Sequence, residues 1–321
     1  MLKITYIIVA NLLFISSLYS GWNGNIKFGC DTNIMKYSEK ENPISSNMIQ
    51  LSQTYRTKIS NIFPRKTKLK ISMKKSIYEL SQKSNYSYSI DLKQPLGNYK
   101  YLSFNYKYID DIYLRQYADL DQGALGYIYE GSNCYFDNVK ISLNYEEPLI
   151  NKKSRISVSL LYETQFYNKY FTEFDLELSG FKVKYTNDMY PFKYSISWRT
   201  SDAKNITLND VLISTMNADR GYKENSINIV LKYPTIVPNE NYGFSLILNQ
   251  RFFSSNILED NLHYNRTHQD TQYTVWRSFY LFGIKNKVFL KYRARNTSSN
   301  YSWVEQLKTF DKFNMEHVVY F

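Results

Sequence analysis

The chain ends on the stretch Phe313-Asn314-Met315-Glu316-His317-Val318-Val319-Tyr320-Phe321, and this stretch decides the fold. In an extended chain, successive side chains point to opposite faces, so every second residue shares a face. One face of this stretch is apolar and aromatic apart from His317, and it carries Phe313, Met315, Val319 and Phe321. The other face begins with Asn314 and Glu316. The alternation predicts a β-strand that ends on an aromatic residue.

This strand resembles the closing strand of a bacterial outer-membrane β-barrel. In that class a C-terminal aromatic residue, with apolar residues at alternate positions before it, is the signal by which the barrel assembly machinery recognises its clients. The resemblance assigns this role to Phe313, Met315, Val319 and Phe321. It implies a Gram-negative, porin-like barrel that contacts membrane lipid, lipopolysaccharide and the assembly machinery, and it indicates no specific family.

The N-terminal segment predicts export. Lys3 precedes an apolar run from Ile4 to Leu18, and the small residue Ser20 follows. This order is typical of a secretory signal peptide, here residues 1–20, which leaves 21–321 as the barrel. The alternative is a membrane anchor helix, but such a helix needs about 20 apolar residues, and Asn11 interrupts this shorter run.

Composition is consistent with a membrane barrel. The mean hydropathy of −0.47 would ordinarily indicate a soluble protein. Mean hydropathy does not detect barrel strands, because each strand alternates residues that face lipid with residues that face the lumen. Aromatic residues make up 17% of the chain, and they suit both strands and the girdles at the membrane interfaces.

Period-2 alternation recurs along the whole chain and predicts fourteen strands. In one segment the apolar phase shifts, from Leu176 and Leu178 to Phe181 and Val183, and Gly180 lies at the shift. A glycine at a phase shift predicts a β-bulge. Residues 271–282 form the least regular strand, because Tyr273 and Val275 share a face with Arg277.

The connections between these strands alternate between shorter and longer segments, such as 94–98 and then 110–135. That alternation predicts a single up-and-down antiparallel transmembrane barrel, with short periplasmic turns, longer extracellular loops and both termini in the periplasm. A soluble β-sandwich has the same alternation within each strand. The export segment, the two classes of loop length and the terminal Phe321 favour the barrel.

The faces opposite the apolar sets carry more basic than acidic residues. Rings of Lys and Arg favour anions in a pore. The central candidates for channel lining are Lys70, Arg199, Lys232 and Arg293, and a companion acidic patch is expected at Glu173, Asp175 and Glu177. The alternative is that many of these cations lie at strand ends and reach lipid headgroups or lipopolysaccharide phosphates.

The long loop 110–135 is the expected constriction of the lumen, with Asp110, Asp111, Arg115, Asp119 and Asp121 as candidate residues. Asp119-Leu120-Asp121-Gln122-Gly123 resembles the opening of a calcium loop. The remaining ligand positions are not matched, so we expect a solvated acidic loop and no metal site.

Cys30 and Cys134 would lie in an oxidising compartment, where a disulfide would pin the long loop across the barrel mouth. The alternative is two cysteines that do not pair.

Two functions remain open at this point. The first is an outer-membrane channel for small, preferably anionic solutes. The second is a surface-display barrel, blocked inside, whose outer loops bind a partner or substrate.

An enzyme is not expected. His263 and His268 share a loop region with Asp260 and Asp270, but no nucleophile motif accompanies them,. No cofactor motif is present, and strand-wise distribution of the basic residues speaks against nucleic acid as a partner. The sequence does not determine the oligomeric state.

Overall fold

The computed structural model describes residues 21–321 except 39, 41, 61–64, 111, 113–133, 150–152, 168–174, 190, 208–218 and 239. The segment expected to be a signal peptide, residues 1–20, lies outside the described residues. Among the residues described, no helix has the length and apolarity needed to cross a membrane.

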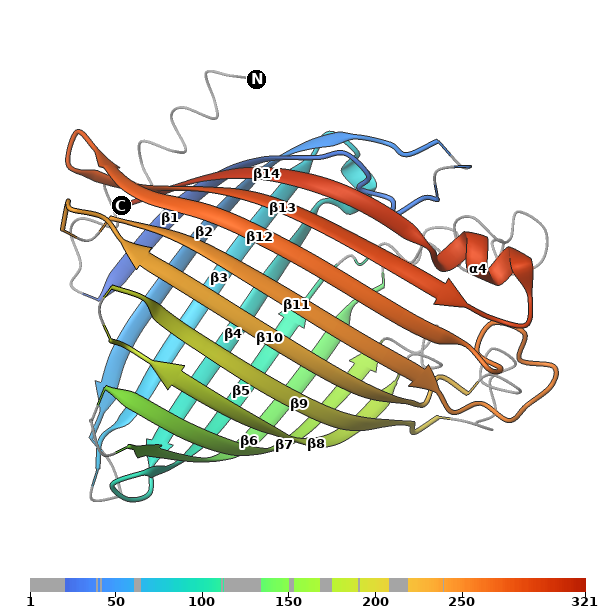
Figure 1. The fold of residues 1–321 in the computed structure, drawn as a ribbon, viewed down its shortest axis with the longest axis horizontal. Helices are drawn as coiled ribbons and strands as arrows, with labels where there is room; N and C mark the ends of the chain where they lie inside the picture. Colours follow the sequence, from blue (N-terminus) through green and yellow to red (C-terminus); the bar gives the residue numbers. More distant parts are fainter. Residues whose placement is uncertain are drawn as a thin grey trace.

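Fourteen antiparallel strands form one closed barrel in which each strand pairs with its neighbours in sequence and β1 pairs with β14 (Figure 1). The predicted all-β, up-and-down barrel is therefore confirmed. The strands are β1 (Trp22–Asp31), β2 (Ser46–Ile59), β3 (Thr67–Tyr78), β4 (Asn85–Pro95), β5 (Lys100–Ile109), β6 (Phe136–Pro148), β7 (Ser154–Tyr167), β8 (Leu176–Asn187), β9 (Lys193–Asn205), β10 (Tyr222–Pro234), β11 (Asn241–Phe253), β12 (Thr267–Leu281), β13 (Ile284–Ser298) and β14 (Phe310–Tyr320). In the described part of the chain, two short helices, η2 (Ser81–Lys83) and α4 (Ser302–Lys308), lie in connections.

The two ends of the barrel differ. We call the end at which β1 begins and β14 finishes the turn end, and the opposite end, where α4 lies, the loop end (Figure 1). Connections at the turn end are short, as at 96–99 and 282–283, whereas the loop end carries 110–135 and 254–266. The alternation is not strict, because 79–84 at the loop end is no longer than 60–66 at the turn end.

The two faces of the barrel wall have opposite chemistry. On β6, Ile141 and Leu143 point outward and are 38% and 46% exposed, whereas Asn144 on the inner face is only 7% exposed. A water-soluble sandwich places its apolar residues in the core. Here the apolar side chains are on the outside and polar ones are shielded inside, so the sandwich alternative is wrong.

β12 is the strand with the least regular sequence pattern. Tyr273 and Val275 face outward together with Arg277, as the pattern predicts. The Arg277 guanidinium lies 5.5 Å from the ring centroids of both Tyr242 and Phe279, near the turn end. The aromatic neighbours accommodate this charge, because a guanidinium is attracted to aromatic rings.

The barrel closes between β1 and β14 at the C-terminal aromatic residue. The Gly24 amide donates to the Phe321 carbonyl oxygen at 2.8 Å, and the Phe321 amide donates to the Gly24 carbonyl oxygen at 3.0 Å. A Cβ atom on Gly24 would overlap the Phe321 ring, so the ring covers the glycine. Phe313 and Met315 on the same strand face outward and are exposed, whereas their role in assembly stays a prediction.

The predicted β-bulge at Gly180 is wrong. β8 pairs residue by residue with both neighbours across this position, from Leu176 to Asn187. The apolar phase shifts because Leu176 and Leu178 point into the barrel, where they form a buried cluster with Ala203 and Tyr222. The glycine serves a different purpose, since a Cβ atom there would overlap the Thr200 carbonyl oxygen of β9.

The acidic patch expected beside that phase shift does not form. Continuous pairing places Glu177 on the outward face, between the inward Leu176 and Leu178. Asp175 is buried at the loop end, where its carboxylate accepts the Tyr167 amide at 2.6 Å. Glu173 lies outside the described residues.

Asp175 predicts a pH-dependent stability. Burial raises the pKa of this carboxyl to about 6, although the Tyr167 amide opposes the shift. Because the folded state favours the protonated form, the stabilisation is full below the unfolded pKa near 4 and is lost as pH rises through about 6. We expect the unfolding free energy to fall by about 1–3 kcal/mol between pH 4 and pH 7.

The measurement is denaturant unfolding in detergent micelles at the two pH values. Asp175→Asn has no titrating group at this position and is expected to remove most of the difference. An unchanged difference in that variant would assign the pH dependence to other groups.

Candidate functional site: a basic wall inside the barrel

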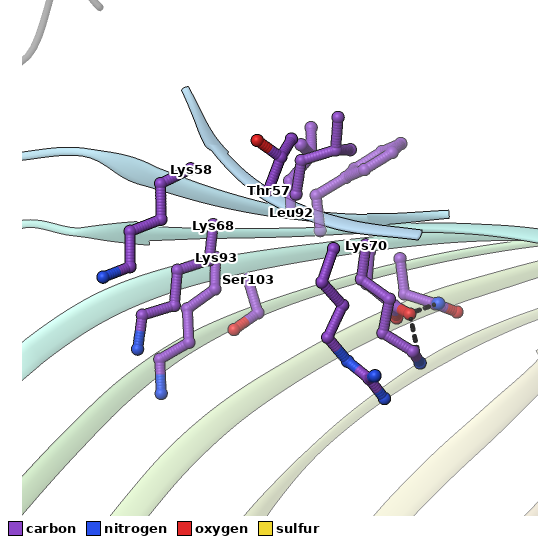
Figure 2. A pocket seen from close by; sticks show the side chains of 12 residues that line it. Thr57, Lys58, Lys68, Lys70, Leu92, Lys93 and Ser103 are labelled. Atoms are coloured by element: carbon purple, nitrogen blue, oxygen red, sulfur yellow. Dashed lines mark hydrogen bonds and ion pairs between the residues drawn. The ribbon is translucent and has the colours of Figure 1, made fainter. Parts of the chain in front are cut away.

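The inner surface of β2, β3 and β4 carries a cluster of cations near the turn end, which we call the basic wall. It consists of Arg56, Lys58, Lys68, Lys70 and Lys93. In Figure 2 Lys58, Lys68 and Lys93 project to one side of the sheet, whereas Thr57 and Leu92 project to the other. The strand period therefore places these cations on the inner face and their sequence neighbours Thr57 and Leu92 on the outer face.

Strand register places the cations of the basic wall directly opposite one another. Lys58 is paired with Lys68 across β2 and β3, and Lys68 with Lys93 across β3 and β4. In the next layer Arg56 is opposite Lys70. Like charges directly opposite each other destabilise a sheet by about 0.2–1 kcal/mol per pair. These like-charge pairs therefore lower the stability of the barrel at the basic wall.

One carboxylate compensates part of the wall. Asp91 lies 2.8 Å from the Lys70 ammonium and also accepts the Asn105 side-chain amide at 2.6 Å (Figure 2). The Lys93 ammonium lies 3.3 Å above the Tyr101 ring centroid. Within the described part of the chain, Lys58, Lys68 and Lys93 make no ion pair. This row therefore presents to the lumen three ammonium groups without a direct ion pair, although Glu146 of β6 lies close enough to attract Lys93 electrostatically.

A second basic group lies on the inner face of β8, β9 and β10. It consists of Lys182, Lys184, Lys193, Arg199 and Lys232. Lys182 is opposite Arg199, and Lys193 is opposite Lys232. The nearest carboxylate is Glu163, which lies 3.9 Å from the Arg199 guanidinium and 3.1 Å from the Lys140 ammonium.

The four predicted channel-lining residues all lie on the inner face, but they differ in charge compensation. Lys70 and Arg199 have the carboxylates described above, and Arg293 lies 3.1 Å from Asp270. Lys232 makes no ion pair among the described residues and is opposite Lys193. The pattern also places Lys58, Lys68 and Lys93 on inward faces, but they were not among the central candidates, and their lack of direct ion pairs depends on strand register. The turn at 60–66 could have indicated this row. A hairpin that turns there places Arg56 opposite Lys70 and Lys58 opposite Lys68.

Only one of the predicted constriction residues is described. The Asp110 carboxylate accepts the Tyr86 amide at 2.5 Å, and the Asp110 amide donates to the Tyr86 carbonyl oxygen at 3.1 Å. Asp110 is therefore tied to the start of β4. Asp111, Arg115, Asp119 and Asp121 lie outside the described residues.

The predicted disulfide between Cys30 and Cys134 is wrong. Cys30 faces outward on β1, whereas Cys134 is buried just before β6. β2, β3, β4 and β5 lie between these two strands around the barrel. Because adjacent strands are about 4.8 Å apart, this separation far exceeds the roughly 7 Å between Cα atoms that a disulfide tolerates.

The histidines at the loop end do not form a hydrolytic triad. His263 Nδ1 lies 2.7 Å from an Asp260 carboxylate oxygen, and the Ser255 hydroxyl donates to that carboxylate at 3.1 Å. In a triad the serine hydroxyl bonds the histidine instead. Burial lowers the pKa of His263 well below its usual range and raises the pKa of Asp260.

The Asp270 carboxylate forms ion pairs with Arg293 and Arg295 and not with a histidine. In the described part of the chain, no group of three His, Cys, Asp or Glu side chains is arranged to hold a metal ion.

Comparisons with known proteins find likeness in structure alone. No protein-family model matches the chain, and no curated protein matches it. The solved structures that it resembles include OccAB4 of Acinetobacter baumannii, at 8% identity and TM-score 0.45 over 94% of this chain and 97% of that chain. An anion-selective porin from Comamonas acidovorans matches at 8% identity and TM-score 0.43, over 93% and 98%. OprD of Pseudomonas aeruginosa matches at 8% identity and TM-score 0.44, over 94% of both chains.

At these identities and TM-scores, the likeness says nothing about solute or mechanism, which rest on the chain's own residues. The architecture rests on the strand pairing, which gives a closed, up-and-down antiparallel barrel of fourteen strands.

Proposed function

We propose that this protein is an outer-membrane channel that passes small solutes and prefers anions. The observation that carries the proposal is the row Lys58, Lys68 and Lys93, which lies on the inner face and makes no direct ion pair with a carboxylate among the described residues.

The outer surface supports a place in a lipid bilayer. Large apolar residues on outward faces are exposed around the barrel, among them Leu143, Leu160, Ile196, Leu231 and Leu290. Closed barrels satisfy every strand hydrogen bond internally, which lets them cross a membrane. The apolar N-terminal run and the Phe321 closing strand point to the outer membrane of a Gram-negative cell, with the barrel assembly machinery and lipopolysaccharide as partners.

The inner surface supports the anion preference. A channel lined by one sign of charge concentrates counter-ions, and rings of Lys and Arg select for anions. The basic wall and the second basic group lie on different strands of the same barrel, so cations project into the lumen from both. Strand number supports an aqueous path, because eight strands leave only room for side chains while sixteen to eighteen leave a channel.

The test is a planar-bilayer recording with the refolded protein. We expect discrete conductance steps in potassium chloride, and a reversal potential in a salt gradient whose sign shows that chloride is the more permeant ion. The selectivity should weaken as salt is raised, because ions screen the wall.

A cation-selective channel would contradict the anion preference. A protein that inserts but does not conduct would contradict the channel and favour a surface-display barrel, in which the outer loops bind a partner.

A further inference from the structure

A cavity of about 310 Å³ lies inside the barrel at its loop end, well separated from the basic wall at the turn end. It is bounded by inward residues where β7, β8, β10, β11, β12 and β13 reach the loop end, and by residues of the loops. Its volume is at the lower end of the range for small-molecule sites. The side chains that decide its chemistry are Arg251, Phe253, His263, Arg266, His268 and Arg295.

The cavity is cationic. The described residues that line it include no carboxylate. Two of the arginines are paired with carboxylates. Arg251 donates two hydrogen bonds to Glu224, and Arg295 donates two hydrogen bonds to Asp270. Arg266 makes no direct ion pair among the described residues, although Asp260 lies close enough to attract it electrostatically. Burial and the neighbouring arginines lower the pKa of Arg266, which an anion in the cavity would oppose.

Among the described residues, two buried side chains at this cavity carry polar atoms without hydrogen-bond partners. His268 is 3% exposed, and neither of its ring nitrogens makes a hydrogen bond. Arg266 is 4% exposed and bonds the Leu262 carbonyl oxygen through Nη1, but its Nε atom has no partner. Leaving a buried donor unsatisfied costs about 1–3 kcal/mol, and such groups are rare in folded proteins. Their joint presence at one cavity points to a ligand that accepts hydrogen bonds.

An aromatic surface adjoins these donors. The Arg266 guanidinium lies 3.7 Å from the Phe253 ring centroid, and the His268 ring stands edge-on to Phe253 at 5.1 Å. Leu176 and Tyr222 of the buried apolar cluster also line the cavity. An apolar group on the ligand would pack against this surface and leave its anionic group beside the donors.

We propose that the loop-end cavity binds a small organic oxyanion, in which a carboxylate or phosphate group accepts hydrogen bonds from Arg266 and His268 and an apolar group packs against Tyr222 and Leu176. The site goes beyond the proposed channel function, because it can be occupied whether or not the lumen conducts. Oxyanions fit the donors well, since a guanidinium presents several N–H groups in one plane and a neutral imidazole presents one.

The test is isothermal titration of the purified full-length barrel in detergent with phenyl phosphate. We expect saturable binding, and we expect inorganic phosphate to bind at least about tenfold more weakly because it lacks the apolar group. Benzylamine has a comparable ring with a positive charge and should not bind. Benzoate in place of phenyl phosphate separates carboxylate from phosphate preference.

Two variants test the donors. His268→Phe keeps a ring against Phe253 but removes both ring nitrogens, and Arg266→Gln removes the guanidinium with its unsatisfied Nε atom. Each should weaken phenyl phosphate binding by about tenfold or more, since hydrogen bonds to charged groups are the strong ones. The control is Lys75→Gln, which removes one positive charge from the outer face of β3 and should leave binding unchanged.

Should Arg266→Gln fail to fold, His268→Phe and the ligand-induced rise in the unfolding temperature of the wild type still decide the question. Absence of saturable binding by the wild type to both phenyl phosphate and benzoate would overturn the proposal. Equal weakening in Lys75→Gln would also overturn it, because binding would then reflect net charge alone. Failure of the channel proposal shows separately, as a loss of conductance or selectivity in the bilayer recordings.

Discussion

Gly180→Ala is expected to destabilise the barrel by about 1–3 kcal/mol, the usual penalty for overpacking. A Cβ atom at this position would overlap the Thr200 carbonyl oxygen and lie 2.9 Å from Ser201 Cα. Both obstacles are backbone of β9, which hydrogen bonds hold in register on both sides. The backbone cannot swing aside as a flexible side chain would, so β8 and β9 must move apart.

The measurement is denaturant unfolding in lipid vesicles, supported by the shift in gel mobility between heated and unheated samples. The matched control is Gly97→Ala, because no atom lies within 4 Å of a Cβ built there. That change should be neutral or stabilise by about 0.4–1 kcal/mol, since alanine restricts the unfolded chain. Equal unfolding midpoints for the two variants would refute the argument.

Neutralising the row of the basic wall in the triple variant Lys58→Gln/Lys68→Gln/Lys93→Gln is expected to change selectivity and stability in opposite directions. The anion-over-cation permeability ratio should fall by about tenfold at low salt, because a charge at roughly 6 Å is worth about 0.7 kcal/mol even in water. The unfolding free energy should rise by about 0.2–1 kcal/mol for each like-charge pair that is relieved. Two such pairs lie in this row, Lys58 with Lys68 and Lys68 with Lys93.

Its control removes the same net charge from the outer face in Lys75→Gln/Lys100→Gln/Lys223→Gln. These lysines alternate with inward residues on β3, β5 and β10. Selectivity should stay close to that of the wild type in the control. If both triple variants lose selectivity equally, the basic wall has no special role; if the inner triple loses stability instead, the lysines serve the fold and not the solute.

The sequence was most informative where local pattern and tertiary environment agree. Alternation along β14 fixed which residues face outward, and the apolar set of Phe313 and Met315 is exposed as that pattern predicts. Arg277 was located correctly for the same reason, because period-2 alternation holds even when one member of the apolar face is a cation. A side chain's face depends only on its position in the strand, which the sequence states directly.

Prediction failed where the same pattern has two physical meanings. The phase shift at Gly180 is compatible with a bulge and also with a change in which face is apolar, and only the pairing of β8 with β7 and β9 distinguishes them. The bridge between Cys30 and Cys134 failed because the separation of two strands around a closed barrel is a property of the whole sheet.

For the candidate sites, the sequence identified which faces carry the cations but not which of these cations form ion pairs with carboxylates. It placed Lys70, Arg199, Lys232 and Arg293 on the inner face, where all four lie. Whether a carboxylate lies within reach depends on cross-strand register, which gives Lys70 a partner in Asp91 and leaves Lys68 between two other lysines.

The sequence by itself thus determined that this chain is a closed, up-and-down barrel and, except at the start of β8, which face of each strand looks inward, because both follow from short-range periodicity and loop length. Only the tertiary structure decided which cations lack a direct ion pair, what a side chain at Gly180 would overlap, and that Arg266 and His268 meet at one buried cavity. Those properties arise between strands, and the distances between strands are set by register and closure of the whole barrel.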